Sequence, residues 1–172
     1  MYIPPYDRNA ECNIRGLKFE PVARALFESY GYETRPALKH EGVYQHIDFW
    51  AKGKDGEWHG VDAKAMKRLN RSDADTQAEW TFIEWKNQYG LDGWLVKGAE
   101  IMCFEVEGGA LVCQREKLLE WARGVVDMDK AVTSSRDCKY CVYTRKDRMD
   151  LMSLVRFSDM PKGLMKFFPT KG

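Results

Sequence analysis

The sequence predicts an α/β protein of the α+β kind, with a central mixed β-sheet flanked by helices. Apolar residues recur at helical spacing near the start of the chain and again after residue 114. Between these segments lie short alternating runs bounded by glycine, which are typical of strands. A helix, then strands, then a further helix indicates helices packed on a mixed sheet.

The first helix is predicted over residues 13–30, where Gly31 ends the periodic pattern. Pro21 lies inside this segment and removes one helix hydrogen bond, so the helix either starts close to it or bends there. A first strand is predicted at residues 32–35, followed by a loop over residues 36–45.

The later elements follow from alternation, glycine pairs and helical spacing. We predict strands at residues 101–106 and 110–114 around a turn at Gly108-Gly109, a helix at residues 115–126, and strands at residues 142–143 and 151–155 around a turn at residues 146–148.

Length and charge limit the class of protein. The 172 residues predict a single domain, with core motifs at about 14–68 and a C-terminal hairpin extension at about 138–172. With 27 Lys and Arg against 26 Asp and Glu, the chain is not a polycation, so nucleic-acid binding requires local basic patches. No apolar run is long enough to span a bilayer and no secretory leader is evident, so we expect a soluble intracellular protein.

The segment HIDFWAKGKDGEWHGVDAK, residues 46–64, predicts two strands joined by a turn. Lys54-Asp55-Gly56 fits a three-residue hairpin loop with glycine in the left-handed position. Paired residue numbers then sum to 110, which places Asp48 opposite Asp62 and His46 opposite Lys64. A two-residue turn at Asp55-Gly56 would instead shift the register and separate the two aspartates.

The two faces of this hairpin differ in polarity. One face is predicted to be apolar and to pack on a helix, through Ile47, Phe49, Ala51, Val61 and Ala63. The other face carries Asp48, Asp62 and Lys64, and Gly60 opposite Trp50 would leave space beside them.

Two neighbouring carboxylates repel each other unless a cation lies between them. Hard oxygen ligands without a His or thiolate cluster suit Mg²⁺ or Mn²⁺, and Lys64 could stabilise charge on a phosphate. The alternative is a solvated strand face on which Lys64 neutralises one aspartate.

The spacing of Asp48 from Asp62-Ala63-Lys64, between strands and after a helix, resembles the PD-(D/E)xK nuclease superfamily. The stretch RGLKFE, residues 15–20, is similar to the opening helix of archaeal-type Holliday junction resolvases and small phage-encoded endonucleases. By this resemblance Glu20 is the third acidic residue of the site.

The resemblance implies a restriction-endonuclease-like core and metal-dependent hydrolysis of DNA phosphodiester bonds. Glu20, Asp48, Asp62 and Lys64 would be catalytic, and the three carboxylates would hold Mg²⁺ or Mn²⁺. It also implies duplex or branched DNA as the partner, a homodimer for junction cleavage, and, since residues 80–95 are similar to phage-encoded members, action in a host cytoplasm.

Basic side chains provide candidate DNA-binding groups. Lys67, Arg68 and Arg71 follow Lys64, where cations would meet phosphates, although a solvated loop explains them equally well. A second cluster near the C-terminus contains Lys139, Arg145, Lys146 and Arg148, and its alternative explanation is a charged hairpin tip.

Several further residues are candidates for binding. Trp50 and Trp58 lie on the acidic face and could stack on unpaired bases. The five cysteines form an odd set, which favours reduced thiols, and Cys138 and Cys141 have the CxxC spacing of some metal sites. His46, Gln77 and Glu84 are possible additional site residues.

Two other functional classes remain open at this point. A non-catalytic nucleic-acid-binding protein with a nuclease-like fold would bind DNA without divalent ions. A structural interaction domain would bind no nucleic acid.

Overall fold

Two mixed β-sheets organise the computed structural model of the chain, which describes residues 11–70 and 72–170, with side chains from Ile14 onward. Within these residues the elements are α1 (Glu11–Ser29), β1 (Glu33–Pro36), α2 (Lys39–Gln45), β2 (Phe49–Lys52), β3 (Trp58–Lys64), β4 (Trp80–Lys86), β5 (Ile101–Val106), β6 (Gly109–Gln114), α3 (Arg115–Val125), β7 (Asp127–Val132), β8 (Cys141–Tyr143), β9 (Leu151–Arg156), a short 3₁₀ turn (Phe157–Asp159) and β10 (Lys166–Pro169).

The larger sheet has six strands in the order β1-β2-β3-β5-β6-β10, and the smaller has four in the order β4-β9-β8-β7. Each sheet contains one parallel pair, β3 with β5 and β7 with β8, among antiparallel neighbours. The α+β class and the mixed sheet are therefore confirmed. The division into two sheets was not predicted.

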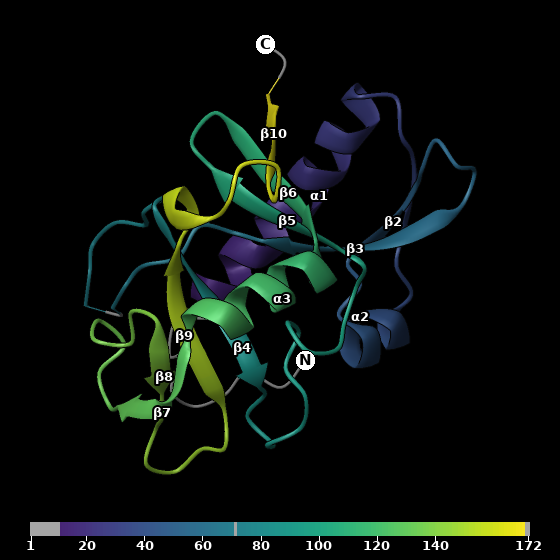
Figure 1. Cartoon of the computed structure of the whole chain (residues 1–172). Helices are drawn as coiled ribbons and strands as arrows, with labels where there is room; N and C mark the ends of the chain where they lie inside the picture. Colours follow the sequence, from purple (N-terminus) through teal and green to yellow (C-terminus); the bar gives the residue numbers. More distant parts are fainter. Residues whose placement is uncertain (1–10, 71, 171–172) are drawn as a thin grey trace.

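The six-stranded sheet is covered on both faces (Figure 1). On one face, α1 packs its apolar side chains, such as Phe19 and Phe27, against Val61 of β3. On the other, Phe104 of β5 packs with Leu118 of α3 and with residues of the four-stranded sheet. The strand that carries Asp62 thus lies inside a layered structure.

Helix α1 confirms the first predicted helix and runs from Glu11 to Ser29 through Pro21, so the proline does not end it. Gly31 follows with φ of +84°, a left-handed conformation that favours glycine. Strand β1 then pairs with β2, close to the predicted position. Because α1 stays continuous through Pro21, Glu20 lies within the helix.

The loop predicted over residues 36–45 was wrong, because residues 39–45 form helix α2. The Glu41 carboxylate accepts a hydrogen bond from the Leu38 backbone N–H at 2.6 Å, which caps the first turn. No residue of α2 is buried. A helix that packs no apolar face on the core has no apolar stripe by which the sequence would predict it.

The later elements agree with the predicted positions within one or two residues, although the turn between β5 and β6 lies at Glu107-Gly108 and Gly109 already pairs with Val106. Residues 141–143 and 151–156 are strands of the smaller sheet, whereas β10 joins the larger sheet beside β6. The single-domain assignment stays a prediction.

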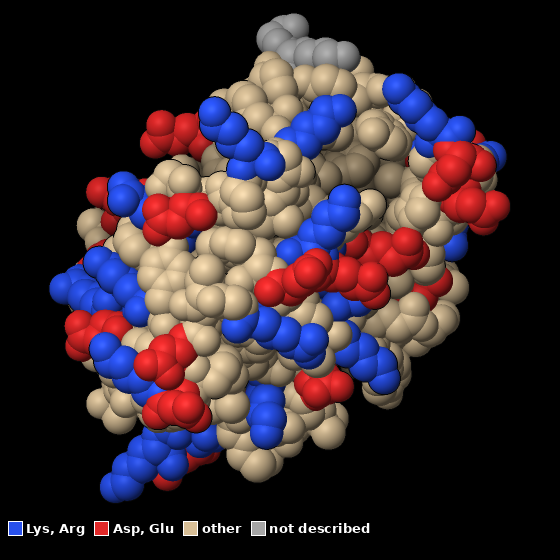
Figure 2. All heavy atoms as spheres, viewed as in Figure 1, with Lys and Arg blue, Asp and Glu red and all other residues tan. Residues whose placement is uncertain are grey.

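The surface carries both signs of charge, and Figure 2 shows lysine and arginine interspersed with acidic residues over the face in view. This agrees with the formal net charge of +1. Within the part of the chain that the structure describes, no helix is both long and apolar enough to cross a bilayer.

Candidate active site

The hairpin of β2 and β3 has the predicted register within its ladder, whereas the predicted pairing of His46 with Lys64 is wrong because His46 ends helix α2. The pairs run from Phe49–Val61 to Lys52–Trp58, so paired numbers sum to 110. Gly53 N–H donates to the Glu57 carbonyl at 2.8 Å, and Gly56 has φ of +84° in the three-residue loop. The two-residue turn, which would have separated the aspartates, is excluded.

The regular ladder ends just before Asp48. The backbone N–H of Asp48 donates to the Val61 carbonyl at 2.9 Å, and the Ala63 N–H donates to Asp48 Oδ2 at 2.8 Å. The Asp48 carboxylate therefore continues the hydrogen bonding of β3 at the point where β2 begins. This contact fixes one carboxylate oxygen beside Asp62.

Burial raises the pKa of Asp48 to about 7, and the neighbouring Asp62 carboxylate adds to this rise. The Ala63 N–H and Lys64 oppose it, since both favour the ionised form. Asp48 and Asp62 are thus close enough to repel each other, as the sequence predicted.

Asp62 is only 2% exposed and forms an ion pair with Lys64, whose Nζ lies 2.7 Å from Asp62 Oδ2. Among the described residues no well-aligned hydrogen bond reaches this oxygen. Although burial disfavours the ammonium, the Asp62 and Asp48 carboxylates hold the pKa of Lys64 above its ordinary value. The Lys64 ammonium also lies 5.2 Å from the centroid of the Trp94 ring.

Two further carboxylates approach from separate elements. Burial raises the pKa of Glu20 on α1, Asp62 raises it further and Lys64 lowers it, which places Glu20 beside the pair. Burial likewise raises the pKa of Glu84 on β4, where the Trp94 N–H donates to Glu84 Oε2 at 3.4 Å. Four acidic side chains therefore surround one lysine.

His46 lies at the edge of this cluster. Burial lowers the pKa of its ring, and Lys64 lowers it further, whereas Asp62 raises it. Its backbone is left-handed, with φ of +53°, at the C-terminus of α2. Neutral imidazole is therefore the favoured form beside the lysine.

The predicted apolar face is confirmed except at one position. Phe49, Ala51, Val61 and Ala63 are buried in the core with α1. The prediction that Ile47 belongs to this face is wrong. A Cβ built on Gly60 would lie 2.8 Å from Ile47 Cδ1, so the Ile47 side chain lies on the Gly60 side of the hairpin. Since β2 starts only at Phe49, strand alternation does not govern Ile47, and its side chain fills the space predicted beside Gly60.

The acidic side chains of this cluster offer only hard oxygen donors. In the part of the chain that the structure describes, no three His, Cys, Asp or Glu side chains already converge on a metal position, and the Lys64 ammonium occupies the space beside Asp62. However, the crowded carboxylates would be stabilised by additional positive charge. Oxygen donors of this kind suit Mg²⁺ or Mn²⁺.

The predicted basic residues divide into three groups. Lys67, Arg68 and Arg145 line one cavity. Arg148 instead donates to Gln88 Oε1 at 3.0 Å, and Arg71 lies outside the described residues.

The other candidates have structural contacts. The Gln77 amide donates to the carbonyls of Lys67 and Trp80 and so ties the segment after β3 to the start of β4. The Arg35 guanidinium lies 4.8 Å and 5.5 Å from the ring centroids of Trp50 and Trp58, so it covers both rings.

The cysteines form no shared thiolate site among the described residues. Cys138 and Cys141 are buried, and their thiols donate to the carbonyls of Ser135 and Asp137. Cys103 packs with α1 and Cys113 packs with α3, on opposite faces of the sheet.

The sequence patterns did not indicate Arg15 as a cavity residue, or Trp94 and Asp150 as neighbours of the carboxylate cluster. Residues 80–86 form strand β4 and alternate in burial, so Glu84 and Phe82 lie on one face. A strand predicted at these residues would have given the same placement. Comparison of the chain with protein-family models, with curated proteins and with solved structures found no match.

Proposed function

We propose that this protein is a divalent-metal-dependent DNA endonuclease with a restriction-endonuclease-like core, of the PD-(D/E)xK type. The observation that carries the proposal is the convergence of Asp48, Asp62 and Lys64, with Glu20 arriving from α1. A solvated strand face would leave these groups exposed, whereas Asp62 is buried. Burying like charges is unfavourable, so a binding or catalytic role explains the cluster better than a structural role.

The protein residues have separable roles in the proposed reaction. Asp48 and Asp62 would hold Mg²⁺ or Mn²⁺, and Glu20 would complete or support their donor set. The ion, when bound, supplies positive charge that acidifies water and offsets charge developing on the phosphate. Lys64 is held charged by its carboxylate neighbours and would donate to a phosphate oxygen or orient the attacking water.

The substrate would be duplex or branched DNA, and the cleavage of a four-way junction would require two sites and hence a homodimer. Lys67, Arg68 and Arg145 would contact the DNA backbone. The expected place of action is the cytoplasm, which for a virus-encoded protein is that of the host cell.

The test is cleavage of labelled duplex and four-way-junction DNA in Mg²⁺ or in EDTA. Asp62→Asn keeps the shape of the side chain and removes its charge, and Asp92→Asn is the matched control because Asp92 is exposed. We expect metal-dependent cutting by wild type and Asp92→Asn, and none by folded Asp62→Asn. Binding without cutting in every condition would contradict the nuclease proposal and favour a non-catalytic binding protein.

A further inference from the structure

A second site candidate lies beside the carboxylates, in a cavity of about 390 Å³ between α1, the segment after β3 and the four-stranded sheet. This volume lies within the range of about 300–1,000 Å³ that is typical of small-molecule sites. The cavity is lined by Arg15, Lys67, Arg68, Leu69, Asn70, Phe82, Thr133, Ser135, Tyr143, Arg145 and Met152.

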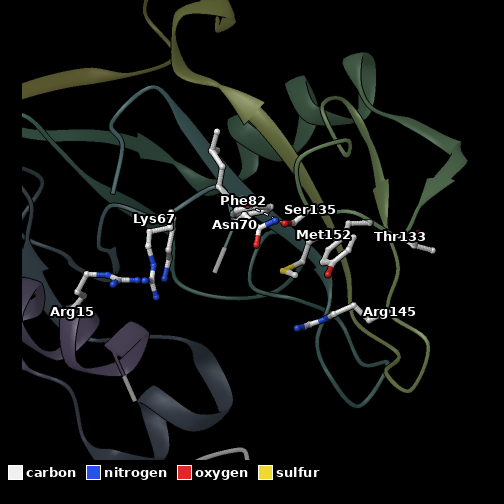
Figure 3. Close-up of a pocket in the computed structure, with 11 residues that line it drawn as sticks. Arg15, Lys67, Asn70, Phe82, Thr133, Ser135, Arg145 and Met152 are labelled. Carbon is white, nitrogen blue, oxygen red and sulfur yellow. Dashed lines mark hydrogen bonds between the residues drawn. The ribbon is translucent and has the colours of Figure 1, made fainter. Parts of the chain in front are cut away.

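The charge of the lining favours an anion. Four cationic side chains and no carboxylate belong to it. Figure 3 shows Arg15 and Lys67 entering from one side and Arg145 from the opposite side, with their charged ends directed into the space between. Arg145 is held there by its ion pair with the buried Asp150. Cations that converge from separate elements suit a phosphate group.

The remaining lining favours a planar ring. Phe82 and Tyr143 are half-buried aromatic residues, and the Arg145 guanidinium lies 5.8 Å from the centroid of the Tyr143 ring. Asn70, Thr133 and Ser135 add polar groups at the same cavity. Aromatic faces, polar groups and cations together are the features that bind an unpaired nucleotide.

The cavity adjoins the carboxylate cluster along β4. Glu84 and Phe82 lie on the same face of this strand, two residues apart, which is a separation of about 7 Å. Glu84 also pairs with Met152 of β9, a cavity residue. A DNA strand with one phosphate at Asp62 could therefore reach the cavity with a nearby nucleotide.

We propose that this cavity receives an unpaired nucleotide of the DNA substrate, with its phosphate among Arg15, Lys67 and Arg145 and its base against Phe82 and Tyr143. The inference rests on the proposed nuclease function and deepens it, because it names the substrate class. The preferred DNA contains single-stranded nucleotides, as in a flap, a gap or an opened junction. Fully paired duplex leaves the cavity without a ligand.

The test measures binding without divalent ions, so that cleavage does not enter. Labelled oligothymidylate and blunt duplex of equal length are titrated with wild type, Tyr143→Leu and Tyr143→Phe in EDTA. Leucine keeps the apolar contact of Tyr143 with the core but removes the aromatic face, and phenylalanine keeps the ring. Thymidine 5′-monophosphate serves as a competitor.

We expect wild type and Tyr143→Phe to bind oligothymidylate at least about tenfold more tightly than duplex, because stacking contributes about 1–3 kcal/mol per base. Tyr143→Leu should lose about tenfold for oligothymidylate and little for duplex. Equal affinity for both DNAs in wild type, or an unchanged preference in Tyr143→Leu, would overturn the proposal. Competition by thymidine monophosphate in wild type, lost in Tyr143→Leu, would support the proposal, because this nucleotide carries the same phosphate and base.

The nuclease proposal and the cavity proposal can be refuted independently of each other. Loss of the single-strand preference while Mg²⁺-dependent cutting persists would refute the cavity assignment alone. A preference that depends on Tyr143, without cutting in any condition, would refute the nuclease and leave a binding site for single-stranded DNA.

Discussion

Two buried carboxylates in this molecule have the same kind of partner but different surroundings. Asp62 is 2% exposed and pairs with Lys64, and Asp150 is 3% exposed and pairs with Arg145. Around Asp62 lie three more carboxylates, those of Glu20, Asp48 and Glu84. The lining of the cavity next to Asp150 contains only cationic charged groups.

The difference lies in the local charge around each pair and not in burial alone, and the proposed function assigns the metal to the more acidic environment. Near Asp62 one lysine faces four acids, so the cluster lacks positive charge and would gain from a bound cation. Near Asp150 the ion pair orients a guanidinium toward the cavity, and Glu84 of the carboxylate cluster is a neighbouring acid. The following experiments test this distinction, beginning with the largest effect.

The first experiment removes the cation of each environment in turn. Lys64→Gln should reduce cleavage about 1,000-fold, equivalent to about 4 kcal/mol, because the phosphate loses its charged donor. Arg145→Gln should weaken DNA binding but leave the cleavage rate of bound DNA nearly unchanged. Single-turnover kinetics at saturating protein would measure both, with Lys117→Gln, exposed on α3, as the control. Equal losses in the two variants would erase the proposed difference.

The second experiment breaks the ion pair of Arg145 and Asp150. Asp150→Asn should lower the free energy of unfolding by about 3 kcal/mol, since it leaves the largely buried Arg145 without its counter-charge. Urea unfolding at pH 7 would measure the loss. Asp150→Asn should still cut DNA in Mg²⁺ at temperatures well below its Tm. A stable variant without activity would instead place Asp150 in the catalytic cluster.

The third experiment uses the pKa of Asp48, which is raised from 3.8 to about 7. Below about pH 4 the carboxyl is protonated in both folded and unfolded protein, so it carries no penalty. Above about pH 7 it is ionised in both, and the folded state carries the full penalty. In EDTA, stability should therefore fall between about pH 4 and pH 7.

The expected fall is about 2 kcal/mol, allowing for solvent at a partly exposed carboxyl. Urea unfolding across this pH range, with wild type and Asp48→Asn compared, would measure it, because the amide cannot ionise. Addition of Mg²⁺ should reduce the fall in wild type. The same pH dependence in Asp48→Asn would show that Asp48 is not its cause.

The hairpin was predictable because its determinants are local. Gly56 fixes the turn, and the turn fixes which residues of β2 and β3 are paired. The position of Ile47 was not predictable, because it depends on where the ladder ends. Helix α2 was not predicted, because none of its residues is buried and its sequence has no helical periodicity of apolar residues.

The second sheet and the cavity depend on contacts between distant segments. Strand β7 pairs in parallel with β8, an arrangement that no turn dictates. Arg15 and Arg145 come from opposite ends of the described chain and meet only through the tertiary structure. Sequence patterns could therefore indicate the carboxylates and Lys64, but not the aromatic and basic cavity beside them.

Strand β10 has a consequence for the order of folding. Phe168 packs on Phe27 and Tyr30, and the Tyr30 hydroxyl donates to the Pro169 carbonyl across 139 residues of sequence. Contacts of such long range form slowly, because a large loop must close first. Helix α1 also packs on Phe49 and Val61 of β2 and β3, which follow it closely in sequence, so this contact closes only short loops. We therefore expect α1 and the hairpin that holds Asp48 and Asp62 to come together before β10 closes over Phe27 and Tyr30.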